Sequence, residues 1–176
     1  MNIVAATQEI KSFALKKGFS KVGVTPAKKY NNDINRLNEW LGNNYNASME
    51  WMENRSDERS NIFSYYPEAK SVVVFGINYY TGNASNNRSI YKISNYAWGD
   101  DYHNILKSKL SLILDYMRTK IDKLDGLVCV DTAPIMEKAW AQRAGIGWIG
   151  KHTNILTQEY SSWIFLGVII INKKLE

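Results

Sequence analysis

Two runs of apolar residues constrain the fold of this chain more than any other feature. Ser71–Ile77 reads Ser-Val-Val-Val-Phe-Gly-Ile, and Trp163–Ile171 is the longest apolar stretch. A strand with one face in water alternates polar and apolar side chains, so the first run predicts a strand that is covered on both faces. The second run is too short to cross a bilayer, and it is another strand candidate. The sequence therefore predicts a buried sheet with helices packed around it.

The remaining periodic segments predict helices and short strands in an irregular order. Apolar residues recur at helical spacing near the amino terminus, around Ile34–Leu41 with Asp33 as a possible cap, over 47–54, and over Asp101–Leu124. We expect further strands at Lys21–Thr25, Leu127–Val130 and around Asn154–Thr157, a polar loop over 55–61, and a helix from Pro134 to Ala144. Without a strict βαβα rhythm the fold class is α+β, with a mixed or antiparallel central sheet flanked by helices.

Composition narrows the class of protein. The 176 residues suit a single domain over 1–176, and 45% hydrophobic against 22% charged residues is typical of a globular chain. Cys129 is the one cysteine, which excludes an internal disulfide, a Cys-ligated zinc site and an iron–sulfur cluster within this chain. The formal net charge of +5 is compatible with a polyanionic partner. Without a signal peptide pattern, we expect a cytoplasmic protein that does not enter a membrane.

The first candidate site is a carboxylate between a predicted strand and a predicted helix. Asp131 follows Leu127–Val130, and Thr132-Ala133-Pro134 leads into the helix. Loops at strand ends often carry functional groups, but Asp131 or Thr132 could equally cap the helix. A catalytic acid at neutral pH needs a raised pKa, which apolar burial can provide and which the nearby helix amino terminus opposes.

The second candidate is the glycine-rich segment Gly145–Gly150, which Lys151, His152 and Thr153 follow. Glycines let backbone amides approach a ligand, and the three side chains could donate hydrogen bonds to an anionic or amide-rich group. The glycine spacing does not match a P-loop. A tight turn between a helix and a strand would also explain the glycines.

The third candidate is the segment Ile93–His103, which carries Tyr96, Trp98 and two adjacent aspartates. It suits either a ligand pocket or aromatic core packing with an aspartate cap for the long helix, in which case His103 is a structural first-turn residue. We predict no metal site, because the two histidines lack a third ligand nearby in sequence. Cys129 has the position of an inert buried thiol in a strand.

In their order and separation these three segments resemble the amino-terminal part of the epoxyqueuosine reductase family. The resemblance is carried by Ile-Ser-Asn-Tyr-Ala-Trp-Gly-Asp-Asp-Tyr-His at 93–103, Val-Asp-Thr-Ala-Pro-Ile-Met-Glu at 130–137 and Ala-Gly-Ile-Gly-Trp-Ile-Gly-Lys-His at 144–152. It covers essentially the whole chain. Three long motifs in the right order are a far more specific signal than any one of them.

The resemblance implies a cobalamin-dependent oxidoreductase of queuosine biosynthesis, acting on tRNA as a monomer. Family members reduce the epoxide of epoxyqueuosine to queuosine with cobalamin bound in a nitroreductase-like domain, and two [4Fe–4S] clusters supply the electrons. The aspartate of the family's Val-Asp-Ser/Thr-Ala-Pro motif, here Asp131, is the proposed proton donor. The residues that we expect to contact cobalamin are Asp131 itself, Arg55, Tyr96, Trp98, Gly150, Lys151, His152 and Thr153.

The chain departs from the family in one respect. With a single cysteine it ligates neither cluster, so we expect a catalytic domain that lacks the ferredoxin-like region and needs an outside reductant. Two alternatives stay open at this point. One is a cobalamin-binding or tRNA-contacting fragment without catalysis, and the other is a flavin-dependent relative of the nitroreductases.

Overall fold

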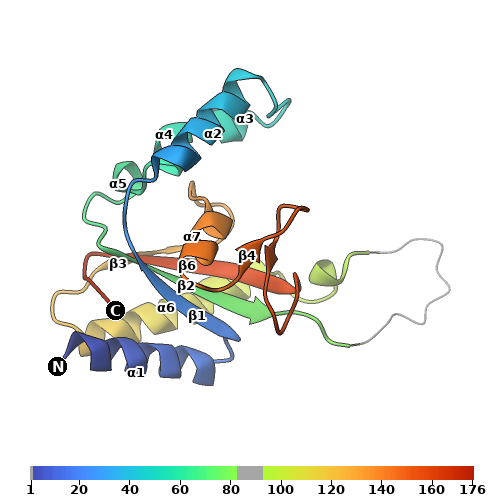
Figure 1. Ribbon diagram of the computed structural model, residues 1–176. Coiled ribbons are helices and arrows are strands. Elements are labelled where there is room, and N and C mark those ends of the chain that lie inside the picture. The colour runs from blue at the N-terminus through green and yellow to red at the C-terminus, as the bar shows by residue number, and fades with distance from the viewer. Residues whose placement is uncertain (1, 83–92) are drawn as a thin grey trace.

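A four-stranded antiparallel sheet forms the centre of the molecule (Figure 1). The computed structural model describes residues 2–82 and 93–176. Strand order across the sheet is β1 (Lys21–Pro26), β2 (Ser71–Asn78), β6 (Ile164–Ile171) and β3 (Gly126–Cys129). The two apolar runs of the sequence pair with each other as β2 and β6, with Val74 opposite Val168. The predicted α+β class is confirmed, and every strand pair of this sheet is antiparallel.

Helices cover both faces of the sheet, which explains why β2 and β6 lack polar alternation. On one face, α1 (Ile3–Lys16) and α6 (Tyr102–Lys120) pack against Val73 and Phe75 of β2. On the other face, α7 (Glu137–Arg143) packs against Val72 and Val74. Figure 1 shows α1 and α6 below the sheet and α7 above it. Burial of each such side chain stabilises the fold by roughly 1.5–3 kcal/mol, so the helices on both faces of the sheet contribute to its stability.

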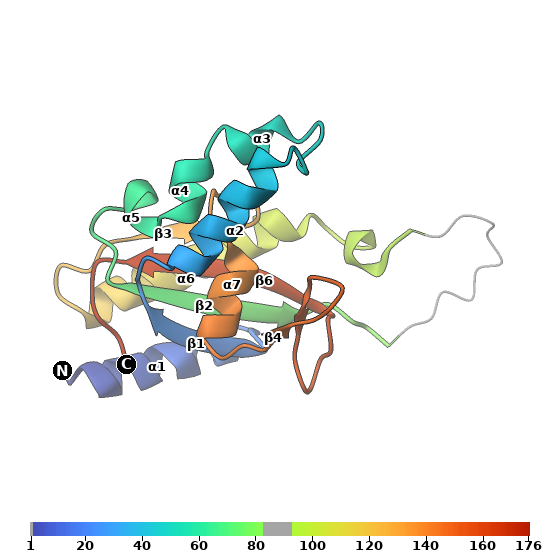
Figure 2. The ribbon, with the colours of Figure 1, turned by 45° about the horizontal axis from the view of Figure 1, so that its top comes forward.

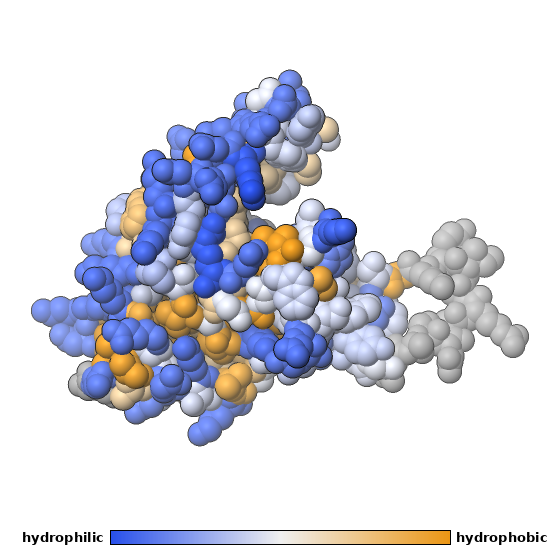
Figure 3. Space-filling view, viewed as in Figure 1, coloured by the Kyte–Doolittle hydropathy of each residue, from blue (hydrophilic) through white to orange (hydrophobic). Residues whose placement is uncertain are grey.

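Four short helices between β1 and β2 form an arm on the α7 side of the sheet, visible in Figure 2. The helical arm comprises α2 (Asn31–Gly42), α3 (Glu50–Glu53), α4 (Ser56–Ser60) and α5 (Ile62–Tyr65). Arg143 of α7 forms an ion pair with Asp33, and its guanidinium lies 3.7 Å from the ring centroid of Tyr30. In the space-filling view of Figure 3 the upper part of the arm is mostly hydrophilic, whereas apolar atoms surface below it.

Several predicted boundaries are wrong. The expected loop over 55–61 contains α4, whose acidic first turn and basic last turn complement the helix dipole. Asp33 is not a cap but lies inside the first turn of α2. The long helix ends at Lys120 rather than Leu124, although Asp101 caps its start as one interpretation predicted. The next helix begins at Glu137 rather than Pro134.

Two smaller elements complete the described ranges. A short hairpin consists of β4 (Trp148–Ile149) and β5 (Ile155–Leu156), and the 3-10 helix η1 (Asn95–Ala97) precedes α6. Within residues 2–82 and 93–176, no helix combines the length and apolar character that a membrane span requires.

Candidate active site

Asp131 lies on a loop that leaves the edge strand β3 and reaches α7. Val130 is buried, whereas the Asp131 side chain is 60% exposed and its backbone has a φ of +49°. One carboxylate oxygen, Oδ2, lies 3.1 Å from Nε2 of His103 on α6. A positive φ is costly for a residue with a side chain, although aspartate tolerates it better than most. The loop therefore presents a carboxylate at the surface rather than packing it in the core.

His103 joins two carboxylates into one network. Its Nδ1 atom lies 2.7 Å from Oδ1 of Asp101, and that same oxygen accepts a hydrogen bond from the His103 backbone amide. The hydrogen bond with Asp131 raises the pKa of His103, with a further contribution from Asp101. The backbone amide of His103, followed by its side chain, lowers the pKa of Asp101. The interpretation of His103 as a purely structural residue missed this contact with Asp131.

Glu137 holds the loop from the opposite side. The backbone N–H of Asp131 donates a hydrogen bond to Oε1 of Glu137 over 2.6 Å. Burial raises the pKa of Glu137 from 4.5 to about 7. The alternative that Asp131 or Thr132 caps the following helix is wrong, because the cap position is Met136 and no side chain caps it. Glu137 lay within a motif of the sequence analysis, but no sequence signal assigned it this contact.

Four rings, from β6, α6 and the residue that follows β2, form an aromatic stack beside this network. The stack runs from Tyr79 through Phe165 and Tyr102 to His103, with centroid separations of 4.3, 4.1 and 4.0 Å. The Phe165 and Tyr102 planes differ by 3°. Burial raises the pKa of Tyr102 to about 12, with further contributions from the charges of Asp131 and Glu137. The stack thus places aromatic rings next to the carboxylates of Asp101 and Asp131.

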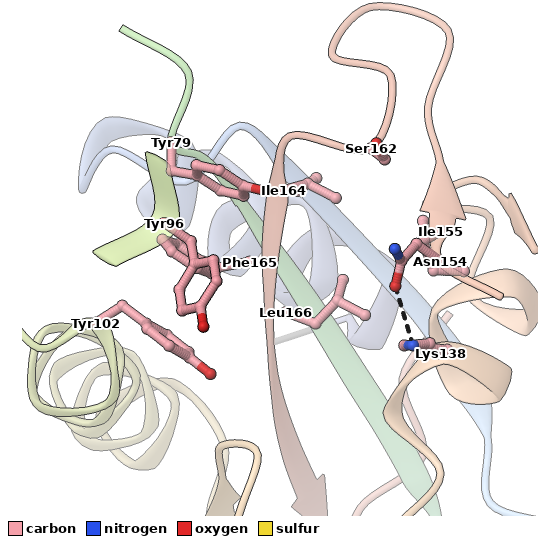
Figure 4. A pocket seen from close by; sticks show the side chains of 10 residues that line it. All are labelled: Tyr79, Tyr96, Tyr102, Lys138, Asn154, Ile155, Ser162, Ile164, Phe165 and Leu166. Atoms are coloured by element: carbon pink, nitrogen blue, oxygen red, sulfur yellow. Dashed lines mark hydrogen bonds between the residues drawn. The ribbon is translucent and has the colours of Figure 1, made fainter. Parts of the chain in front are cut away.

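Two adjoining hollows open along the aromatic stack, with volumes of about 390 and 320 Å³. Tyr79, Tyr96, Tyr102 and Phe165 line both of them. In the first hollow, Nζ of Lys138 donates to Oδ1 of Asn154 over 3.1 Å, across from the rings (Figure 4). The second hollow is the more apolar of the two in its lining. Flat rings on one side and an ammonium–amide pair on the other could bind a large planar ligand with polar edges.

The predicted cofactor residues fall into three groups. Tyr96 lines both hollows and Trp98 lines the second, next to η1. The turn of the β4–β5 hairpin consists of Gly150, Lys151, His152 and Thr153, and none of them lines either hollow. The next residue, Asn154, lines the first hollow. Arg55 lies in the helical arm, where it forms an ion pair with Glu58 and lies 5.4 Å from the ring centroid of Tyr65.

The raised pKa values of Glu137 and His103 predict a fall in stability with rising pH. The folded chain keeps the Glu137 proton between pH 4.5 and about 7, whereas the unfolded chain has released it. The raised pKa of His103 acts in the same direction above its ordinary value of 6.5. We expect the free energy of unfolding to fall by roughly 1–3 kcal/mol from pH 5 to 8, at ~1.4 kcal/mol per pKa unit. Urea denaturation of the Glu137→Gln variant should show only the smaller His103 contribution, and an equally steep fall would contradict the assignment.

Sequence comparisons show which known proteins this chain is similar to. A protein-family profile described as "Epoxyqueuosine reductase QueG, DUF1730" matches residues 59–132. The epoxyqueuosine reductase of Synechocystis sp. is 42% identical over 158 residues, covering 88% of this chain and 54% of the relative. That of Atelocyanobacterium thalassa is 41% identical over 176 residues, covering 98% of this chain and 56% of the relative. The chain spans about half the length of the curated relatives it matches.

Solved structures agree with the sequence relatives. An epoxyqueuosine reductase crystallised with an epoxyqueuosine-modified tRNA-Tyr stem loop superposes with a TM-score of 0.91 at 30% identity, covering 99% of this chain and 47% of that one. The Bacillus subtilis epoxyqueuosine reductase has a TM-score of 0.85 at 25% identity, covering 99% and 47%, and was captured with an aspartate-bearing catalytic loop swung out of its active site. By sequence and by fold, this chain is similar to about half the length of the epoxyqueuosine reductases.

Proposed function

We propose that this chain is the cobalamin-dependent catalytic domain of an epoxyqueuosine reductase, which reduces an epoxide in tRNA to an alkene. The observation that carries the proposal is the position of Asp131. Its carboxylate lies at a strand end, in contact with His103 and beside the aromatic stack. Conversion of the epoxide to the alkene takes two electrons and two protons and releases the ring oxygen as water. The chain therefore has to supply protons at one place and hold an electron source close to it.

The lining of the two hollows supports a corrin as the ligand, because a corrin is a flat macrocycle with amide side chains around its rim. Tyr96 and Trp98 are 54% and 44% exposed at the hollows, and Trp148 and Trp163 are also exposed. Large apolar side chains gathered at a surface are typical of a binding site. Lys138 and Asn154 offer an ammonium and an amide to the polar rim. These features support cobalamin binding in a nitroreductase-like domain.

The contacts of the remaining predicted residues belong to the same proposal. Tyr96 and Trp98 would pack against the macrocycle, and the turn from Gly150 to Thr153 would meet its amide side chains, with Arg55 contacting it from the helical arm. When bound, cobalamin would supply the electrons that open the epoxide ring. Cys129 alone cannot ligate a four-cysteine cluster, so those electrons would come from a group that these 176 residues do not themselves hold.

Asp131 is the proton donor in this proposal. Ring opening develops negative charge on the epoxide oxygen, and an acid within about 3 Å of it can protonate it. His103 can return a proton to Asp131, because its Nε2 atom lies within hydrogen-bond distance of the carboxylate. Asp101 orients the ring by contacting Nδ1. The swinging aspartate loop of the Bacillus subtilis relative supports a corresponding loop here at 131–136.

A tRNA is the proposed macromolecular substrate. The support comes from the relative that was crystallised with a modified stem loop and from the net charge of +5. We also propose that the protein is a monomer and that it is located in the cytoplasm. An RNA partner implies affinity that falls steeply with salt, because bound phosphates release counterions.

The first test is retention of the cofactor. We expect the purified chain, mixed with cob(II)alamin and desalted, to keep a visible spectrum of the base-off form. The double variant Tyr96→Ala/Trp98→Ala should retain on the order of tenfold less, because stacking on each aromatic ring contributes about 0.5–1.5 kcal/mol. Tyr45→Ala is the matched control, since Tyr45 is 65% exposed and lines neither hollow. Colourless wild-type protein would contradict the cobalamin proposal, and flavin binding would then be tested in the same way.

A further inference from the structure

The backbone at Asp131 adopts a conformation that needs external support. Its φ of +49° lies in the left-handed region, which is unfavourable for a residue with a side chain. Such a conformation persists only where neighbouring groups hold it.

The loop that carries Asp131 contacts other elements at several points, and three of these contacts bear on its position. His103 contacts the Asp131 carboxylate, Glu137 accepts from the Asp131 amide, and the buried Ile135 anchors the far end of the loop in the core. The other amide hydrogen bonds of the loop are local: the amide of Thr132 donates to the carbonyl of Val130, as does the Thr132 hydroxyl, and the amide of Ile135 donates to the carbonyl of Ala133. The bond to Glu137 is therefore the main-chain contact that reaches beyond the local turns.

We propose that Glu137 is a positioning residue that latches the Asp131 loop, fixing the Asp131 main chain through Oε1 so that its carboxylate faces His103. The inference rests on the proposed function only in that Asp131 is the proton donor. An ionised carboxylate accepts a stronger hydrogen bond than a neutral one, and at 2.6 Å this bond is short. Release of the latch would free the main chain of Asp131 to leave the left-handed region and turn its carboxylate away from His103.

The groups around Glu137 make the latch sensitive to pH. The titratable groups that interact with the Glu137 carboxyl come from four elements: Asp131 in the loop, Cys129 in β3, Tyr102 and His103 in α6, and Lys138 in α7. Protonation of Glu137 removes its repulsion with Asp131 and weakens the charge-assisted hydrogen bond. The burial that raises the pKa of Glu137 to about 7 places this change near neutral pH.

Amide exchange in the full chain tests the latch without cofactor or tRNA. We expect the Asp131 amide to be protected from hydrogen exchange in the wild type, and Glu137→Ala to speed its exchange on the order of tenfold, as the loss of one hydrogen bond predicts. Glu137→Gln keeps an acceptor oxygen and should restore most of the protection. The shift of the Asp131 amide resonance with pH near neutrality should be smaller in the Gln variant than in the wild type, because His103 alone of the two groups then titrates beside Asp131. Glu159→Gln is the control, because Glu159 pairs with Lys21 at the surface.

Unchanged exchange at Asp131 in a folded Glu137→Ala protein would overturn the latch. A second measurement separates this outcome from failure of the proposed function. In cobalamin-loaded protein with a chemical reductant, Glu137→Ala should lower kcat with little change in KM for the tRNA stem loop. If the wild type itself shows no reduction, the proposed function fails, whereas the amide data still decide the latch.

Discussion

Replacement of Asp131 by Asn is expected to abolish epoxide reduction while cobalamin binding survives. Asparagine tolerates the positive φ at this position and keeps an oxygen for contact with His103, but it has no carboxyl proton to donate. Loss of a general acid typically costs 10²–10⁴-fold in rate, so we expect a decrease in that range. The measurement is conversion of a modified stem loop to the alkene product, followed by mass spectrometry, with electrons supplied chemically.

The matched control for this prediction is Asp122→Asn. Asp122 is an exposed carboxylate in the turn after α6, and we expect its removal to leave the rate near the wild-type value. Retention of cob(II)alamin by the Asp131→Asn variant shows that its pocket is intact. Equal activity of Asp131→Asn and the wild type would exclude the proton-donor role.

Replacement of Gly147 by Ala is expected to have the largest effect on stability. A Cβ atom at this position would lie 2.0 Å from the backbone oxygen of Leu156 and 3.2 Å from Cγ2 of Ile155. Backbone cannot yield as a side chain can, so the β4–β5 hairpin would have to open. We expect a loss of about 2–4 kcal/mol in the free energy of unfolding, in the range of severe overpacking.

The functional consequence of Gly147→Ala follows from the position of Asn154 beside β5. Displacement of the hairpin would separate Asn154 from Lys138 and reduce cobalamin retention. Urea denaturation measures the stability, and Gly42→Ala serves as control. Gly42 ends α2 with no atom near a new Cβ, so alanine there should stabilise by about 0.5–1 kcal/mol. An unchanged unfolding midpoint for Gly147→Ala would contradict the close packing of this hairpin.

Local features of the chain were predictable because they depend on residues close together in sequence. The apolar runs that became β2 and β6 indicated burial on both faces, and the alternation of Val72 and Val74 with Val73 and Phe75 between the two cores explains why. The cap of α6 by Asp101 needed only the next two residues. The short helices of the arm were harder, since α3, α4 and α5 are too brief for a periodic pattern to develop.

The sequence by itself therefore determined the fold class, the strands of the central sheet and the loop that carries Asp131, and three motifs indicated the family, whereas β4 lies in a segment predicted as a glycine-rich turn. The tertiary structure alone decided what surrounds that carboxylate. His103 lies 28 positions from Asp131, and the rings of the aromatic stack come from β6, α6 and the residue that follows β2. Periodicity reports which face of an element is buried, but which side chains meet depends on how strands and helices pack. For the same reason the sequence assigned no contact to Glu137, whose carboxylate accepts a hydrogen bond from the Asp131 amide only because of the turn in the folded loop.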